Sequence, residues 1–288
     1  MASLVEHDPA WVVAQFERRA RRFETPCADG SVVWHAWGDG PPVVLAHGAH
    51  GAWSHWIRNI DALAAERTVW ALDLPGYGES ALAPREDHAR IAEVIATGLR
   101  QLIAEIPVDI VGFSFGGVVA AHLAALYPQL VRRLILVDTG GLDTPMGIVE
   151  LQRVHGLEGD ERRAALRANL LGLMLHDPTS VDELALYLQA ANGSRARLNP
   201  RWLVLPDKLL QVLPQIRVQL DAIWGEYDGP HPNPALQESV LRQFHPGLDF
   251  RVIADAGHWS MYDRAQDFNR TLLDLLGCPL RSRPTQAS

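Results

Sequence analysis

The chain has 288 residues, of which 48% are hydrophobic and 21% charged, and its formal net charge is −8. This composition is typical of a globular protein that buries a sizeable core, and it excludes a disordered chain. The acidic balance without a basic patch argues against a nucleic-acid partner, and two isolated cysteines, Cys27 and Cys278, suggest a reducing compartment.

The N-terminal region is expected to form an amphipathic helix. Its apolar side carries Val12, Val13, Phe16 and Phe23, and the basic stretch at 17–22 is its solvated face. The region has no apolar stretch long enough for a signal peptide, and no later stretch approaches the length of a membrane span. We therefore expect a cytoplasmic protein without membrane contact.

Short apolar runs then alternate with longer helical patterns. Helices are expected at 88–106 and 115–127, the second apolar nearly all round. Strands buried on both faces are expected at 42–48, 68–74, 108–114 and 133–139. This alternation predicts an α/β fold with a mostly parallel, doubly wound sheet.

The alternation stops after Asp138 and resumes near residue 218. Between them the patterns are helical only, and Ser180 with Glu183 suggests a capping box at the start of a helix over 180–193. Further elements are expected as a helix at 161–175, strands at 218–228 and 249–258, and a last helix at 261–276. We therefore expect a core domain formed by 1–142 and 215–288, with a helical cap or lid at 143–214 over the carboxyl edge of the sheet.

One serine lies between two glycines at the junction of a predicted strand and a predicted buried helix. The sequence Gly112-Phe113-Ser114-Phe115-Gly116 fits a strained turn that exposes a nucleophilic hydroxyl, with small neighbours that let strand and helix approach. A serine hydroxyl needs a base, and His258 follows a predicted strand in the sequence DAGHWS. Asp228, after the preceding strand, would orient that histidine, and Asp138 is the competing acid.

Four motifs together resemble the α/β-hydrolase superfamily. They are HGAHGAW (47–53), DLPGYGES (73–80), GFSFGG (112–117) and the pair WGEYD with GHW, which ends at Trp259. The resemblance implies that Ser114, Asp228 and His258 form the catalytic triad. It also implies that the backbone N–H groups of Ala49 and Phe115 form the oxyanion hole, and that His47 holds the oxyanion loop.

The resemblance leaves the scissile bond open. Serine at position 114 excludes the dehalogenase and epoxide hydrolase branches, which use aspartate. Carboxylesterases or lactonases remain, as do carbon–carbon hydrolases of aromatic ring-fission products, whose C-terminal pattern the stretch after His258 resembles. Arg195 and Arg197 are candidate partners for the carboxylate of such a product, but HGAHGA lacks that group's Gly-Pro-Gly pattern and Phe113 replaces its polar residue.

The predicted function is therefore a serine hydrolase acting on a small, largely apolar ester or carbonyl substrate. His50, Trp53, Phe113 and Trp259 are the remaining candidate substrate contacts, and no metal site or cofactor motif is visible. A non-catalytic small-ligand binder on the same fold, or a cofactor-free oxygenase or perhydrolase with the same triad, are the alternatives. The expected partner is a small molecule, and the sequence leaves a homodimer open.

Overall fold

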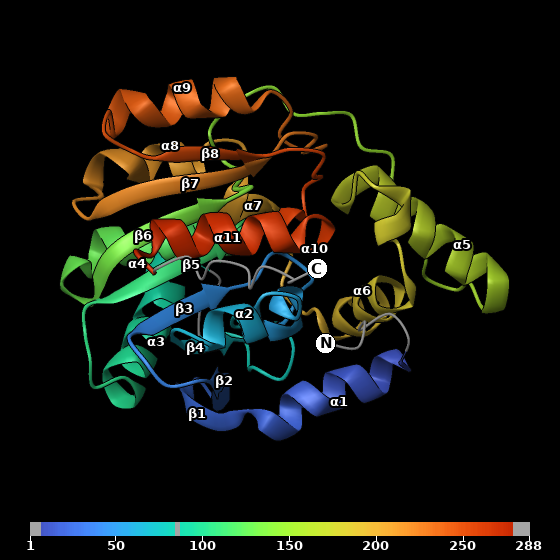
Figure 1. Ribbon diagram of the computed structural model, residues 1–288, viewed down its shortest axis with the longest axis horizontal. Helices are drawn as coiled ribbons and strands as arrows, with labels where there is room; N and C mark the ends of the chain where they lie inside the picture. Colours follow the sequence, from blue (N-terminus) through green and yellow to red (C-terminus); the bar gives the residue numbers. More distant parts are fainter. Residues whose placement is uncertain (1–6, 84–86, 279–288) are drawn as a thin grey trace, which may run out of the picture.

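The computed structural model describes residues 7–83 and 87–278, and its centre is one eight-stranded sheet (Figure 1). The strand order is β1-β2-β4-β3-β5-β6-β7-β8; the pairs β1/β2 and β2/β4 are antiparallel and the remaining pairs parallel. The strands are β1 (Arg21–Cys27), β2 (Gly30–Trp37), β3 (Pro42–Ala46), β4 (Thr68–Leu72), β5 (Val108–Phe113), β6 (Val131–Val137), β7 (Gln219–Gly225) and β8 (Phe250–Ile253). The mostly parallel α/β sheet expected from the sequence is confirmed.

The first two strands were not expected. Helix α1 (Pro9–Arg19) begins at an Asp8 cap and ends before Phe23, which lies in β1 and packs its ring 5.2 Å from that of Trp70. The two strands form a hairpin around a two-residue turn in which Ala28 has a φ of 49°. The basic residues before Phe23 hide this change from helix to strand, because they continue the helical charge pattern.

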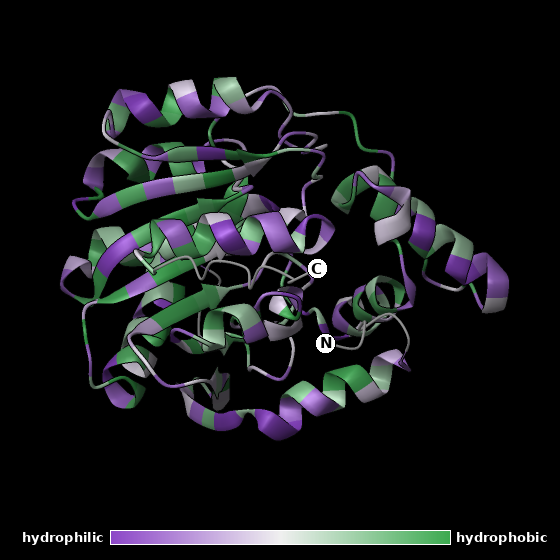
Figure 2. Ribbon diagram, viewed as in Figure 1, coloured by the Kyte–Doolittle hydropathy of each residue, from purple (hydrophilic) through white to green (hydrophobic). Residues whose placement is uncertain are grey.

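Helices cover both faces of the sheet, as Figure 1 shows. Alternate strand residues supply two separate cores: Val44 and Ile110 belong to one, Val43 and Val111 to the other. Helices α3 (His88–Leu102), α4 (Phe115–Leu126) and α9 (Pro234–Phe244) pack on the first core. Helices α1, α2 (Ile60–Ala64) and α11 (Ala265–Leu275) pack on the second, and the central strands are accordingly the most apolar part of the chain (Figure 2).

Four helices lie between β6 and β7. They are α5 (Gly159–Asn169), which continues into a wider helical turn at Leu170–Met174, α6 (Glu183–Arg195), α7 (Arg201–Val204) and α8 (Lys208–Val212). The cap of α6 is Asp182, whose carboxylate accepts the Ala185 N–H at 2.8 Å, and not Ser180. Residues of α7 and α8 join the sheet core beside α4, whereas α5 and α6 project beyond the sheet (Figure 1).

The segment with α5 and α6 is attached to loops that follow parallel strands. Asn192 is hydrogen-bonded to Ser54 at 3.2 Å, the Arg197 N–H donates to the Gly76 carbonyl at 2.9 Å, and the Trp259 N–H donates to the Met174 carbonyl at 2.6 Å. The buried Asp263 carboxylate accepts N–H bonds from His176 (2.7 Å) and Gly257 (2.9 Å) through the same oxygen. The segment therefore lies over the carboxyl edge of the sheet, and its domain boundaries at 143 and 214 stay a prediction.

Among the described residues, no helix has both the length and the apolar character required to cross a bilayer.

The C-terminal helical region consists of two helices. The first is the short α10 (Ser260–Asp263), which Arg264 separates from α11. The single helix expected at 261–276 is therefore broken, directly after the loop that carries His258.

Candidate active site

Ser114 lies at the turn between β5 and α4 with a strained backbone. Its φ is 50° and its ψ is −118°, a conformation that residues with a side chain rarely adopt. The Ser114 N–H donates to the Val137 carbonyl at 2.8 Å, which ties the turn to the neighbouring strand β6. Because Ser114 is also the N-cap of α4, its half-buried side chain lies at the positive end of a helix.

The two flanking glycines are required by close backbone contacts. A Cβ atom at Gly116 would lie 2.4 Å from the His47 carbonyl oxygen and 2.5 Å from that of Ala46. A Cβ atom at Gly112 would lie 2.6 Å from the Gly116 carbonyl oxygen. Backbone atoms cannot move aside as a side chain can, so strand and helix meet at this turn only because both residues are glycine.

Three side chains from separate loops form one hydrogen-bonded chain. The Ser114 Oγ lies 3.1 Å from His258 Nε2, and His258 Nδ1 lies 3.1 Å from Asp228 Oδ1. Asp228 follows β7 and His258 follows β8, so the carboxyl ends of three parallel strands bring these residues together. Because an ionised carboxylate can only accept hydrogen bonds, His258 Nδ1 must carry the proton of the neutral ring. Nε2 is then free to accept a hydrogen bond from the Ser114 hydroxyl.

The loop after β3 passes directly over the serine. A Cβ atom at Gly48 would lie 3.2 Å from the Ser114 Cβ, so the residue directly before Ala49 is in close contact with the serine. His47 is fully buried; its Nε2 accepts the Leu74 N–H at 2.9 Å and its Nδ1 donates to the Gly48 carbonyl at 2.7 Å. Burial lowers the pKa of His47 to about 4, so a neutral imidazole holds this loop.

Asp138, the competing acid, lies next to this chain but contacts other partners. Its oxygens accept the Gly225 N–H at 2.6 Å and the Ser260 hydroxyl at 2.5 Å. Complete burial, together with the charge of Asp228, raises the pKa of Asp138 well above its ordinary value. Asp228 is equally buried, but His258 and His231 outweigh that burial and hold the pKa of Asp228 well below its ordinary value.

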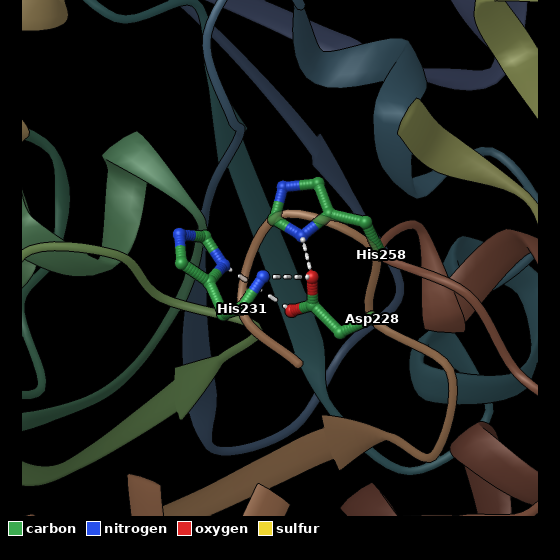
Figure 3. A group of neighbouring side chains, drawn as sticks. All are labelled: Asp228, His231 and His258. Carbon is green, nitrogen blue, oxygen red and sulfur yellow. Dashed lines mark hydrogen bonds and ion pairs between the residues drawn. The ribbon is translucent and has the colours of Figure 1, made fainter. Parts of the chain in front are cut away.

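His231 is a residue of this site that none of the sequence motifs includes. Its side chain is buried, and its Nδ1 lies 3.3 Å from Asp228 Oδ2 (Figure 3). Its backbone N–H also donates to Asp228 Oδ1 at 3.0 Å. The spacing Asp-Gly-Pro-His was the available signal, because an N–H three residues after an aspartate can return to its carboxylate.

The predicted aromatic substrate contacts lie in the packed interior. Trp259 is 1% exposed and donates its indole N–H to the His55 carbonyl, and Trp53 packs between Phe16 and Trp37. Phe113 is also buried, with its ring centroid 5.1 Å from that of His258. This packing favours a structural role for all three aromatic residues, and Phe113 packs directly against the ring of His258.

The two predicted arginine contacts do not bond to the triad. Arg195 is exposed at the end of α6, and Arg197 donates to the Ser80 carbonyl. His50, in contrast, is exposed beside Ala49 and lines a cavity of about 530 Å³ that continues beneath α5 and α6. That cavity is walled by Leu157, Leu166 and Ala190, and by the half-buried Arg162, which has no ion-pair partner among the described residues.

Asp228, His231 and His258 also have metal-ligating atoms within 4.8 Å of one another, the one such group among the described residues. The same atoms form the hydrogen bonds listed above, so an ion there would replace the bond that orients His258. The absence of a metal cofactor stays a prediction.

A model of the alpha/beta hydrolase family matches residues 43–271. A dihydrolipoyllysine-residue acetyltransferase component of the acetoin cleaving system from Pseudomonas putida is 32% identical; the match covers 82% of this chain, which spans 64% of that relative's length. A pimeloyl-(acyl-carrier protein) methyl ester esterase from Vibrio atlanticus is 39% identical, covering 83% of this chain and 95% of the relative.

A 2-hydroxy-6-oxo-6-phenylhexa-2,4-dienoate hydrolase from Comamonas testosteroni is 26% identical, covering 89% of this chain and 95% of the relative. Among solved structures, a carboxylesterase from Bacillus subtilis superposes with a TM-score of 0.75 at 19% identity, covering 93% of this chain and 95% of that one. At this identity the structural match establishes the fold alone.

Proposed function

Because this chain belongs to the alpha/beta hydrolase family, we propose that it is a serine hydrolase in which Ser114, His258 and Asp228 form the catalytic triad. The observation that carries the proposal is the continuous hydrogen-bonded chain from Ser114 Oγ through both ring nitrogens of His258 to Asp228. Its order along the sequence is the one this fold uses. Esterase and hydrolase names among the relatives support the same class.

The first half-reaction would transfer the acyl group to Ser114. His258 Nε2 removes the hydroxyl proton while Ser114 Oγ attacks the substrate carbonyl carbon, and the resulting imidazolium is stabilised by Asp228. The N–H groups of Ala49 and Phe115 bind the oxygen on which negative charge develops. When the tetrahedral intermediate collapses, His258 returns its proton to the leaving oxygen or carbon.

In the second half-reaction a water molecule attacks the acyl-enzyme. His258 again takes a proton, this time from water, and returns it to Ser114 Oγ as the acid product leaves. No further reactant is required, and the side chains that take part are those of the triad.

The acyl group of the substrate would occupy the cavity beside His50, where both apolar and polar side chains would contact it. This cavity continues from the oxyanion loop beneath α5 and α6, which would act as a cap that excludes water during reaction. An ester is favoured over a ring-fission product because the esterase relative is more similar to this chain than the carbon–carbon hydrolase is. Cytoplasmic location and dimerisation stay predictions.

A serine-directed alkyl phosphonate tests the proposal directly. We expect one equivalent to attach to Ser114, with complete loss of hydrolysis of p-nitrophenyl esters of graded chain length. Ser114→Ala should abolish labelling and reduce kcat by roughly a thousand-fold or more, whereas Ser239→Ala, an exposed serine of α9, should change neither. Labelling elsewhere would refute the triad.

A ring-fission diketone assayed beside the esters separates the two bond types. Faster turnover of the diketone than of every ester would replace the ester assignment by carbon–carbon hydrolysis. A protein that binds such ligands but turns over neither class, with Ser114 unlabelled, would be a binder and not an enzyme.

A further inference from the structure

We propose that His231 is a positioning residue that holds the carboxylate of Asp228 by a hydrogen bond. This bond also reduces the negative charge that the carboxylate presents to His258. The inference rests on the proposed function of the triad and goes beyond it, because a triad requires one histidine and this carboxylate contacts two.

The geometry makes His231 a donor to the oxygen that His258 does not use. Asp228 Oδ1 accepts from His258 Nδ1 at 3.1 Å and from the His231 backbone N–H at 3.0 Å, while Oδ2 lies 3.3 Å from His231 Nδ1 (Figure 3). An ionised carboxylate only accepts, so His231 Nδ1 must carry the proton. The carboxylate is thereby fixed from both sides and cannot rotate away from His258.

The surroundings hold the His231 ring in this position. Prolines at 230 and 232 restrict the backbone on either side. A Cβ atom at Gly140 would lie 2.7 Å from His231 Nε2, so the ring is seated against a glycine backbone. His231 also lines a separate cavity of about 290 Å³, together with Asp143 and Arg201, whereas Asp228 is not among the residues that line it.

This arrangement determines how much negative charge His258 experiences. The groups around Asp228 are His258, His231 and the neighbouring carboxyl of Asp138, and His55 interacts electrostatically with His258. A hydrogen bond from His231 withdraws charge from Asp228, and without it more of that charge would stabilise the imidazolium of His258. The loss of His231 should therefore shift the acid limb of the kcat/KM profile to higher pH.

The test compares His231→Leu, which removes the donor, with His231→Asn, whose side-chain amide can place an N–H near the position of Nδ1. For His231→Leu we expect kcat on a p-nitrophenyl ester to fall about ten-fold with KM unchanged. The acid limb of the kcat/KM profile should move up by roughly half to one pH unit. His231→Asn should restore kcat and the limb to within about a factor of three of the wild type.

A direct measurement on the wild-type protein keeps the inference testable even where a variant does not fold. Nitrogen-15 NMR of labelled histidines should show His231 as the Nδ1–H tautomer at neutral pH. An Nδ1 without a proton, or an acid limb that is the same in wild type and His231→Leu, would overturn the inference. Neither result affects the proposed triad as long as the phosphonate still labels Ser114, so the two failures are distinguishable.

Discussion

Asp228 and Asp138 are buried neighbours at the ends of adjacent strands. Their replacement by asparagine should nevertheless have very different effects on kcat. In Asp228→Asn the negative charge next to His258 is lost. With charge centres roughly 4 Å apart, that charge is worth about 4 kcal/mol to the imidazolium at an intermediate effective dielectric constant. A ten-fold rate change corresponds to about 1.4 kcal/mol, so kcat should fall roughly a thousand-fold.

Asp138→Asn should instead leave kcat within about three-fold of the wild type. The amide offers an oxygen to the Gly225 N–H and an N–H to the Ser260 hydroxyl oxygen, which are the two contacts the carboxyl now makes. The φ of 45° at this position is also compatible with asparagine.

The same substitution should change the pH dependence of stability. The pKa of Asp138 is raised in the folded protein, chiefly by burial and then by the charge of Asp228, so this carboxyl keeps its proton above pH 4 while the unfolded chain loses it. As the pH rises from about 4 to the raised pKa, the unfolding free energy of the wild type should therefore fall by about 1.4 kcal/mol per pH unit. Asp138→Asn should lack this decrease.

The assay is kcat for a p-nitrophenyl ester together with urea unfolding of the wild type and both variants between pH 5 and 8. Equal losses of activity in both variants, or a larger loss in Asp138→Asn, would refute the assignment of Asp228 as the acid. A stability difference between wild type and Asp138→Asn that does not change with pH would refute the raised pKa.

Three further predictions follow from contacts described above. Gly116→Ala should lower the unfolding free energy by about 3 kcal/mol, whereas Gly193→Ala, with open space around its Cβ position in α6, should be neutral or slightly stabilising; thermal unfolding decides. Arg162→Gln should raise KM about ten-fold for an ester with a terminal carboxylate but not for its neutral analogue. Arg195→Gln should leave KM unchanged for both esters. Equal effects of the two substitutions would show that the acyl group does not bind in the cavity. Dialysis against EDTA should leave kcat unchanged, and a loss restored by a divalent cation would show that the Asp228 group holds a metal.

The parallel sheet could be predicted because β3, β4, β6 and β7 each contain three or more adjacent apolar residues, which is typical of strands buried on both faces. The serine turn could be predicted because its pattern, a serine between two glycines at the junction of a strand and a buried helix, is local in sequence. The hairpin of β1 and β2 could not, because Phe23 follows basic residues that fit a helix equally well.

The remaining site residues depend on contacts between distant parts of the chain. His231 and Trp259 have similar local patterns of small and polar neighbours, yet one contacts the acid and the other packs against Tyr262 in the core. Arg195 and Arg162 are both on the helical segment, and only the path of α5 and α6 decides which of them lines the cavity. Sequence periodicity fixes which face of a helix is buried but not which cavity it borders.

The carboxylate of Asp263 joins two parts of the protein that have different tasks. One of its oxygens receives the His176 N–H from the end of the α5 segment and the Gly257 N–H from the loop that carries His258. A hinge movement at this end of the segment must therefore either break a buried charge-assisted hydrogen bond or displace the base itself. The way in which substrate enters would therefore affect the proposed triad. If the segment opened at the Asp263 contacts, His258 would be displaced and turnover would be slow. If it opened between the end of α6 and the loop after β4, the triad would stay intact during opening.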